Sequence, residues 1–567
     1  MTESDTQSLS KQTIKSINQY AQSDNSVRWA TRILSILVVP GLILVSGFAA
    51  TGAHKPDPGS TLIFLRLFTI GEPLPLVALA LWLVLFPWRA IGKDRGHLQS
   101  VLVYERENRK SLVWLIAISS GILSLVIGKV TGQGVGFSAD EYAALLQADF
   151  LRLGAFTGNL PTEWLPLRDG VTPVFVFEGQ KPTEWVYQYL PGYAILVYLA
   201  GEVDAVALLN PMLNTMTIVL IAAIAGRRWS DKPDLAVLSA LLMATSQQFL
   251  LTGASQYSMP AHLMFNTLWL YGYIAGGRSI LWMGPVGAFA SLLHQPIPHP
   301  LFVAPFLLRM LREKRIGALA YLCLWYTLAI ACFVAWREIG GAIPVSILGM
   351  PKMGNVVVLL MNAIMIATWS APVVSWGLLV AVRNIRALDQ IDLDLLFGIV
   401  AVLLFFLTFV PVTQGHGWGW RYGHQVLVNI VLLAVTGWTS SCRLIEVGLA
   451  RRMLASSLLI SFFVLVPWRT AVAHRIVKPF SRAVDWMSRQ HEMVLVVPAD
   501  SIWYGRDLIR NHPSMKAPVT LRRSVFAGVD TAAIPAQWRS SIRLISVHEL
   551  EKLGLERVGK VVPGSDY

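Results

Sequence analysis

Long apolar segments recur along the chain and alternate with short stretches of charged and turn-forming residues. A helix that crosses the hydrocarbon core of a bilayer, roughly 30 Å thick, needs about 20 mostly apolar residues. The short apolar pair at 280–293 and 299–311 fits either two tilted spans or a re-entrant hairpin. The pattern predicts an all-α polytopic membrane protein with about 11 to 13 transmembrane helices. The predicted spans are 31–50, 73–88, 112–130, 204–226, 234–252, 261–277, 280–293, 299–311, 316–337, 356–382, 394–413, 425–440 and 453–468.

Two longer segments lack this pattern and predict folded parts outside the bilayer. Residues 131–203 are rich in Trp, Tyr, Pro and Glu and predict short interfacial helices, with 190–201 lying on the membrane surface. In the tail, an amphipathic helix at 469–490 precedes strand-like runs at 494–498, 518–525 and 542–547 and short helices at 506–511 and 548–554. We therefore expect a cytoplasmic tail (1–30), a transmembrane domain (31–468, with the outer catalytic loop 131–203) and a small extracytoplasmic α/β domain (469–567).

Composition supports a membrane protein. Hydrophobic residues make up 54% of the 567 residues and charged residues only 14%, whereas about a quarter of the residues of a soluble domain are charged. The net charge is +13, but no basic surface interleaved with aromatic residues indicates nucleic-acid binding. The cysteines, Cys323, Cys332 and Cys442, show neither metal-binding nor disulfide spacing.

The basic residues indicate the orientation of the spans, because cytoplasmic loops of membrane proteins collect Lys and Arg. The first thirty residues lack the pattern of a cleaved signal peptide. We expect a multi-pass protein of the bacterial inner membrane with a cytoplasmic N-terminus and a periplasmic C-terminus. In that orientation most basic residues fall on the inner side: Lys11, Lys15, Arg28, Arg32, Arg89, Lys93, Arg95, Arg106, Arg109, Lys110, Arg227, Arg228, Lys232, Arg278, Arg309, Arg312, Lys314, Arg315, Arg383, Arg386, Arg443, Arg451 and Arg452.

Two adjacent carboxylates, Asp140 and Glu141, follow the third predicted span in the stretch Gly136-Phe-Ser-Ala-Asp-Glu-Tyr142. One explanation is structural, because acidic residues favour helix N-termini and Ser138 can cap the first turn. The functional explanation is that a carboxylate at the membrane edge loses hydration, which raises its basicity. A general base that removes a proton from an acceptor hydroxyl needs that property.

The Asp140-Glu141 pair after an early span resembles the acidic motif of the GT-C glycosyltransferases, which include protein mannosyltransferases and the aminoarabinose transferases of lipid A. Tyr189-Leu-Pro-Gly-Tyr193 is similar to the opening of the second interfacial helix of that plan. The segments 210–229 and 244–249 resemble the two following spans, so the similarity covers roughly 110–310. This chain departs from the plan at its front, where three predicted spans precede the acidic loop and many such enzymes have one.

The resemblance implies an inverting glycosyltransferase of the cell envelope. Its donor would be a sugar on a polyprenyl phosphate, and its acceptor a hydroxyl of a lipid, a glycan or a protein at the outer face of the membrane. Asp140 would be the base, with Glu141 in the same catalytic site. No cofactor is expected, and a divalent cation is left open. Because the leaving group is a phosphate, the site also needs positive charge or hydrogen-bond donors.

The segment His416-Gly-Trp-Gly-Trp-Arg421-Tyr-Gly-His424 offers such donors on the outer side. A guanidinium matches phosphate geometry, and the closely spaced glycines favour an irregular, tightly packed loop. The structural alternative is an aromatic anchor at the membrane interface. We predict that Arg421 and His424 bind the donor phosphate.

Two further histidines, His294 and His299, are candidates for contacts with the donor phosphate. Prolines separate them, so they do not share a helical face and a zinc pair at helical spacing is excluded. The structural alternative is a kinked turn with solvated histidines. A metal ion held by His262, His294 and His299 is the less favoured interpretation.

A cavity open to the outer side, with Asp140 at its rim, should complete the site. We expect its lining to include Tyr193, Gln256, Tyr257, His262 and Tyr422. Two alternatives to sugar transfer stay open: a lipid-linked glycan transporter or flippase, and a polysaccharide ligase or polymerase. Transporters tend to bury charges near the membrane midplane and to contain inverted repeats, and neither is visible in the sequence.

Overall fold

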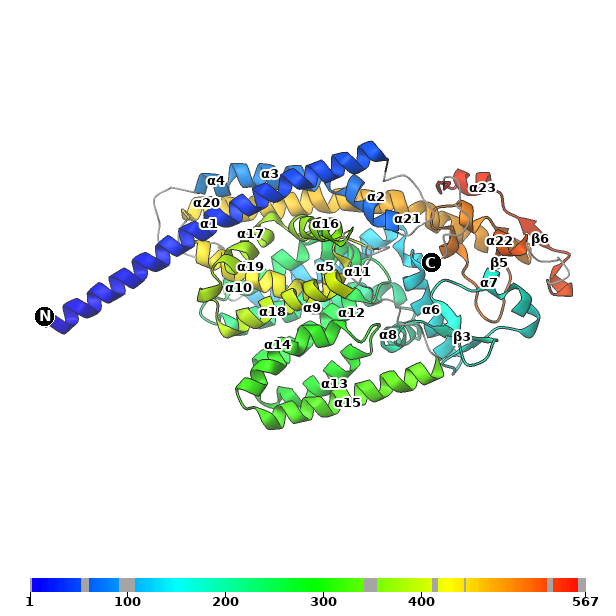
Figure 1. Cartoon of the computed structure of the whole chain (residues 1–567), viewed down its shortest axis with the longest axis horizontal. Coiled ribbons are helices and arrows are strands. Elements are labelled where there is room, and N and C mark those ends of the chain that lie inside the picture. The colour runs from blue at the N-terminus through cyan, green and yellow to red at the C-terminus, as the bar shows by residue number, and fades with distance from the viewer. Residues whose placement is uncertain are drawn as a thin grey trace.

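The computed structural model describes residues 3–52, 61–90, 108–340, 354–409, 417–442, 445–527 and 534–558. The molecule is elongated and mainly helical, with its strands gathered at one end and its N-terminus at the other (Figure 1). We call the end with the strands the loop side, because it contains the segment 131–203. Five residues used in the interpretation of the sequence lie outside the described ranges: Lys93, Arg95, Arg106, His416 and Arg443.

The helical part confirms the expected all-α, multi-pass membrane fold. Its helices follow the order of the predicted spans. They are α1 (Glu3–Thr51), α2 (Thr61–Gly71), α3 (Pro73–Leu85), α4 (Pro87–Ala90), α5 (Arg109–Thr131), α9 (Val206–Arg228), α10 (Asp234–Ala244), α11 (Gln247–Gly253), α12 (Met259–Ala275), α13 (Ile280–Ser291), α14 (Pro298–Arg312), α15 (Ile316–Ile339), α16 (Gly354–Thr368), α17 (Pro372–Arg383), α18 (Gln390–Phe409), α19 (Leu427–Cys442), α20 (Val447–Ile460) and α21 (Val466–Ser488).

Fewer helices cross the full bilayer thickness by length and composition than the apolar pattern suggested. Among the described residues six helices qualify, or up to nine spans if each of three bent pairs counts as one. The difference arises partly because α12, α13 and α14 contain only 17, 12 and 15 residues. The segment 356–382, predicted as one span, is α16 and α17 with a bend of 113° between them.

Large apolar side chains remain exposed on the outward faces of these helices. Examples are Leu115, Ile118 and Ile122 on α5, and Leu324 and Leu328 on α15. A soluble monomer rarely exposes large continuous apolar patches, whereas lipid tails surround such faces without cost. The exposed faces therefore fit helices that lie against lipid.

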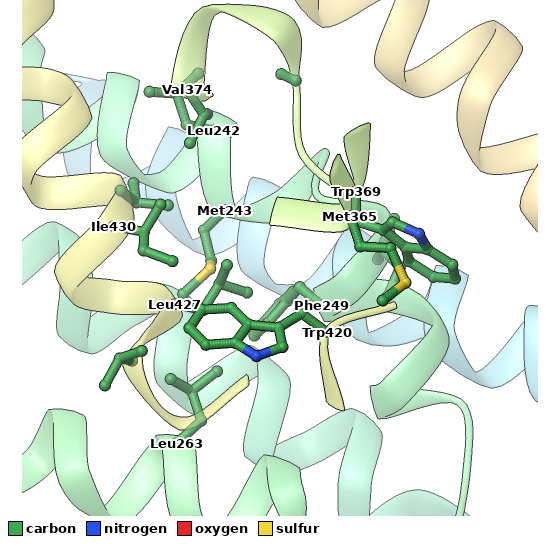
Figure 2. Close-up of a cluster of buried hydrophobic side chains, with 14 of the residues drawn as sticks. Leu242, Met243, Phe249, Leu263, Met365, Trp369, Val374, Trp420, Leu427 and Ile430 are labelled. Atoms are coloured by element: carbon green, nitrogen blue, oxygen red, sulfur yellow. The ribbon is translucent and has the colours of Figure 1, made fainter. Parts of the chain in front are cut away.

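Helices that are distant in the chain share one core. Figure 2 shows Met243 and Phe249 next to Trp420, with Leu427 and Ile430 of α19 closing the same cluster. All of these side chains are buried. The cluster joins the segment before α19 to the α10–α11 pair, and this contact fixes the position of the predicted phosphate-binding loop.

A break between α10 and α11 is matched by an irregularity in the long helix beside it. The two helices meet at 61°, and the carbonyl of Thr245 at the break accepts a hydrogen bond from Ser461 Oγ at 2.7 Å. Ser461 begins a π-helical turn, Ser461–Leu465, that connects α20 to α21. Such turns often mark functional sites, and this one supplies a donor to a carbonyl at the bend that also accepts from Gln247 Nε2 at 3.2 Å.

The loop side contains the remaining elements. Residues 131–203 form α6, α7, α8 and an antiparallel sheet of order β1-β3-β2, and the tail forms a parallel sheet of order β5-β4-β6. The predicted surface helix and the tail strands are present, whereas the antiparallel sheet was not predicted, and 506–511 contains a 3₁₀ turn, Gly505–Leu508. The bounds are α6 (Ala139–Arg152), β1 (Gly158–Asn159), α7 (Arg168–Val171), β2 (Val176–Glu178), β3 (Glu184–Tyr187), α8 (Gly192–Gly201), β4 (Val494–Val497), β5 (Val519–Arg522), α22 (Arg523–Phe526), β6 (Ile542–Leu544) and α23 (Val547–Lys552).

The large loop and the tail share one hydrophobic core. Val494 and Leu521 of the parallel sheet pack in the same cluster as Phe150, Trp164 and Trp185 from the loop. Each sheet alone is too small to bury its apolar face. The two segments therefore fold together as one cap over the loop-side ends of the helices.

A buried ion pair attaches the extra N-terminal spans to the rest of the helical part. Glu72, between α2 and α3, accepts hydrogen bonds from Arg469 of α21 at 2.8 Å, from Thr368 Oγ1 at 2.6 Å and from Trp369 Nε1 at 2.8 Å. The Arg469 guanidinium lies 4.1 Å from the centre of the Trp369 ring. Glu72 and Arg469 are each about 1% exposed at their side chains. Three elements therefore converge on one carboxylate.

We expect Glu72→Ala to lower the free energy of unfolding by about 3–5 kcal/mol, because it leaves the Arg469 charge buried without its partner. The double variant Glu72→Ala/Arg469→Leu should lose less, since no charge is then stranded. Thermal unfolding in detergent measures both. A double variant as unstable as the sum of the single variants would contradict this account.

Candidate functional site

The N-terminus of α6 places Asp140 and Glu141 in different surroundings. Ser138 caps the helix: its Oγ accepts from the Glu141 backbone N–H, and Glu141 Oε2 accepts from the Ser138 N–H at 2.9 Å. This reciprocal pair is a capping box, which satisfies two backbone donors at once. The structural explanation offered for the acidic pair therefore holds for Glu141.

Glu141 also uses its second oxygen. Its Oε1 accepts the backbone N–H of Gln256 at 2.7 Å. Burial raises the pKa of the Glu141 carboxyl, although the two backbone donors act against that shift. Each carboxylate oxygen of Glu141 therefore accepts a hydrogen bond from a backbone N–H group. A catalytic role for Glu141 stays a prediction.

Asp140 faces the interior of the site and meets Arg421. Its Oδ2 accepts from the Arg421 guanidinium at 2.5 Å, and its Oδ1 accepts from the Tyr189 hydroxyl at 2.5 Å. The Asp140 side chain is 9% exposed and that of Arg421 8%. Burial alone would raise the pKa of Asp140, but Arg421 and the Tyr189 hydroxyl outweigh it and hold the pKa below the usual range. The structure thus brings together two predicted residues that lie 281 positions apart in the chain.

The loop before Arg421 is irregular and tightly packed, as its glycines suggested. Gly419 has a φ of 56°, and a Cβ atom there would lie 2.1 Å from Gln248 Oε1. Gln248 Nε2 donates to the carbonyl of Trp418 at 2.7 Å, and Trp418 Nε1 donates to Gln133 Oε1 at 2.7 Å. The loop is therefore anchored to α11 and to the residues that follow α5.

Aromatic rings surround the guanidinium. Arg421 lies 4.5 Å from the centre of the Tyr257 ring and 5.9 Å from that of Tyr422. The Tyr422 ring in turn stacks on Phe406 at 4.6 Å. Cation–π contacts of this kind stabilise a desolvated guanidinium. Tyr257 and Tyr422 thus contact Arg421, and their predicted role in lining a cavity stays a prediction.

His294 belongs to the same cluster. Its ring stacks on Tyr189 at 3.8 Å between ring centres, and its Nδ1 is 3.1 Å from the Tyr187 hydroxyl. The backbone of 190–193 is hydrogen-bonded to residues 292–294, including Tyr193 N–H to the Leu293 carbonyl at 2.6 Å. Burial lowers the pKa of His294 to about 3, so the imidazole is neutral at physiological pH and can reach a phosphate only as a neutral donor.

The remaining predicted residues are buried but less directly placed. His299 has Asn266 Oδ1 at 2.7 Å from Nδ1 and Tyr326 Oη at 3.1 Å from Nε2, so both ring nitrogens are occupied. The ring nitrogens of His262 and His424 have no hydrogen-bond partner in the part of the chain that the structure describes. The predicted phosphate contacts of His299 and His424 stay predictions. The Tyr193 hydroxyl donates to Asn210 at 3.3 Å.

No metal site emerges from these histidines. Among the described residues, no group of three or more His, Cys, Asp or Glu side chains is placed to hold a metal ion. The interpretation of His262, His294 and His299 as metal ligands therefore finds no support.

The tail contributes residues that sequence reasoning passed over. Arg510 donates to the carbonyls of Val135 (2.5 Å) and Gly136, directly before the acidic helix, and packs on the rings of Tyr142 and Phe480. The carboxylate of Asp507 accepts the Ala139 backbone N–H at 3.2 Å. The sequence predicted only a short helix at 506–511, and the charged residues of that stretch, Arg506, Asp507 and Arg510, were the available signal. Tyr189 was likewise noted only as part of a motif.

The fold and site together define a multi-pass membrane protein with a buried carboxylate–guanidinium pair at the loop-side ends of its helices. No protein-family model matches the chain, and no curated protein matches it. Among solved structures it is similar to ArnT from Cupriavidus metallidurans bound to undecaprenyl phosphate, with a TM-score of 0.49 and 10% identity over 71% of this chain and 85% of that one. This similarity is one of backbone fold only.

We expect Arg510→Ala to loosen the backbone before α6, because two carbonyls lose their charged donor. Hydrogen–deuterium exchange of the amides in 135–142 should become at least about tenfold faster, which corresponds to the loss of one such bond. Arg506→Ala is a matched control, since its guanidinium pairs with Asp500 at 3.0 Å, away from this loop. Equal exchange in both variants and the wild type would show that Arg510 does not hold the loop.

Proposed function

We propose that this protein is a membrane glycosyltransferase that transfers a sugar from a polyprenyl-phosphate donor to a hydroxyl acceptor. The acceptor belongs to a lipid, a glycan or a protein, and transfer occurs at the periplasmic face of the inner membrane, with the loop side facing out. The observation that carries the proposal is the buried contact of Asp140 with Arg421. A base for the acceptor and a cation for the leaving phosphate are then both within reach of one reacting centre.

The reaction is a single displacement at the anomeric carbon. The acceptor oxygen forms a bond to that carbon while the bond from the carbon to the donor phosphate oxygen breaks. The hydroxyl proton passes to Asp140, and the charge of the departing phosphate is balanced by Arg421. One displacement inverts the anomeric configuration, and no redox partner is required.

The ion pair explains how the base is kept inactive until the donor arrives. With Arg421 bound to it, Asp140 has a lowered pKa and is a weak base. A donor phosphate competes for the same guanidinium, since its oxygens accept the forked N–H groups well. When Arg421 turns towards the phosphate, burial becomes the main influence on Asp140 and raises its basicity.

The neighbouring groups have supporting roles in this mechanism. Glu141 and Ser138 fix the first turn of α6, and Tyr189 orients the Asp140 carboxylate. Burial and the nearby Asp140 raise the pKa of Tyr189 well above its usual value, so its hydroxyl stays a donor. Neutral His294 stacks on Tyr189 and holds that ring in place.

The other functions fit these contacts less well. A ligase or polymerase would use the same pair with an oligosaccharide donor, so it differs in the size of the donor and not in the chemistry. A transporter needs charges that change partners along a path through the membrane. Arg228 with Asp392 and Arg309 with Asp394 are instead paired at 2.6 Å and 2.5 Å, close to the ends of α9 and α14 opposite the loop side.

We expect Asp140→Asn to lower the transfer rate by about 10²–10⁴-fold, the usual contribution of a general base, while the protein still folds. Transfer of labelled sugar from a polyprenyl-phosphate donor measures the rate. Glu141→Gln is the comparison variant: its one side-chain oxygen can serve only one of the two backbone donors, so we expect lower stability but a much smaller loss of rate per folded molecule. Full activity of Asp140→Asn would remove Asp140 as the base.

Tyr189→Phe should move the acidic limb of the pH–rate profile to higher pH by about half to one unit, the equivalent of one hydrogen bond. The Tyr189 bond favours the carboxylate, so its loss raises the pKa of Asp140, and the base is protonated at a higher pH. Tyr187→Phe is the control, because the Tyr187 hydroxyl contacts His294 and not Asp140. An unchanged limb in Tyr189→Phe would contradict this assignment.

A further inference from the structure

A second polar site lies beside the acidic helix, on the other side of Gln256. A cavity of about 240 Å³ opens where the loop-side ends of α5 and α9 meet α21. Leu125, Ala207 and Pro211 give it an apolar wall, while Lys129, Lys478 and Ser481 give it a polar one. Asp140 is not among the residues that line it. The cavity therefore combines an apolar wall at the membrane edge with two cationic side chains.

The two lysines are held on neighbouring helices. His474, one turn before Lys478 on α21, lies with its Nδ1 2.7 Å from the carbonyl of Val130, the residue after Lys129. Gly132 has a φ of 84°, and a Cβ atom there would lie 2.9 Å from Ser481 Cβ and 3.4 Å from Lys478 Cδ. A residue with a side chain would crowd this junction, so glycine keeps the path of Lys478 clear.

Neither lysine is neutralised within the part of the chain that the structure describes. Asp485, the acidic residue on α21, pairs with Arg489 at 2.7 Å. The carboxylate oxygens of Glu141 accept hydrogen bonds from the backbone N–H groups of Ser138 and Gln256. Lys129 is exposed, Lys478 is half-buried, and Arg475 and Arg482 stand exposed on the same face of α21. The entrance therefore has a local excess of positive charge on the side of the membrane where the sequence pattern leaves few basic residues.

Gln256 connects this cavity to the acidic helix. Its side chain lines the cavity and is 5% exposed, and its Oε1 has no hydrogen-bond partner among the described residues. Its backbone N–H holds Glu141 at 2.7 Å. Gln256 therefore links the wall of the cavity to the first turn of the acidic helix.

We infer that this cavity binds the phosphate head of a membrane lipid, with Lys129 and Lys478 on the phosphate and the start of the lipid chain along Leu125 and Pro211. Ammonium groups bind phosphate through charge-assisted hydrogen bonds. Two lipids carry such a head: a polyprenyl phosphate and an anionic phospholipid. The inference goes beyond the proposed reaction, because binding here requires no sugar transfer.

The test is equilibrium binding of two lipids to the full-length protein in nanodiscs of phosphatidylcholine. One arm uses a labelled polyprenyl monophosphate and the other labelled phosphatidylglycerol. Lys129→Gln/Lys478→Gln should weaken binding by at least about tenfold. Gly134→Met should do the same without changing charge, because a Cβ atom at Gly134 meets nothing within 4 Å and the longer side chain fills the cavity. Arg109→Gln/Lys110→Gln removes an equal charge from the opposite end of α5 and should leave binding unchanged.

The outcomes separate the two lipids and the two proposals. Weakening in the polyprenyl arm alone assigns the site to that lipid, weakening in the phosphatidylglycerol arm alone assigns it to a bilayer phospholipid, and weakening in both assigns it to the shared phosphate. Unchanged binding of both lipids to the double lysine variant would overturn the inference. Phosphatidylglycerol is not a donor in the proposed reaction, so its binding tests this site independently of the roles proposed for Asp140 and Arg421.

Discussion

The buried contact between Asp140 and Arg421 is the interaction on which the site depends. Moving a carboxylate and a guanidinium out of water is costly, and the pair recovers this cost only with close geometry and additional hydrogen bonds. Tyr189 supplies one of these bonds, and the rings of Tyr257 and Tyr422 surround the cation. The elements that carry these residues, α6, the end of β3 and the turn before α19, must therefore be correctly placed at once for any of them to be stable there. That requirement makes the geometry of the site a consequence of the whole fold.

Much of this arrangement could be predicted from the sequence. The length of the apolar segments predicted the membrane-spanning helices, because only helices with mostly apolar side chains are stable in contact with lipid. Asp140 and Arg421 were selected because they lie in two polar motifs that fall on the same predicted side of the membrane. Charged residues are uncommon at a membrane edge, so these motifs were noticeable. The tail strands at 494–498 and 542–547 followed from β-branched runs. These features depend on local composition, which a single sequence displays directly.

The rest depends on contacts between distant segments. The bend of 113° between α16 and α17 falls directly before Pro372, which opens α17, and counting apolar residues alone did not detect it. Glu141 looked equivalent to Asp140 in sequence, yet the cap with Ser138 and the N–H of Gln256 occupy both of its oxygens. The structural role of the first spans could not be predicted either. It depends on the contact of Glu72 with Arg469, which lies 397 residues further along the chain.

The long helix that runs from α20 through the π-helical turn into α21 has a mechanical consequence. It covers 42 residues, Val447–Ser488, which at about 1.5 Å per residue is roughly 60 Å, or twice the thickness of the hydrocarbon core. In Figure 1 it extends from the helical part into the end that contains the strands. Phe480, towards the loop-side end of this helix, packs against Arg510, which in turn holds the backbone directly before the acidic helix. One continuous helical segment therefore joins the bilayer-spanning part of the protein to the support of its acidic helix.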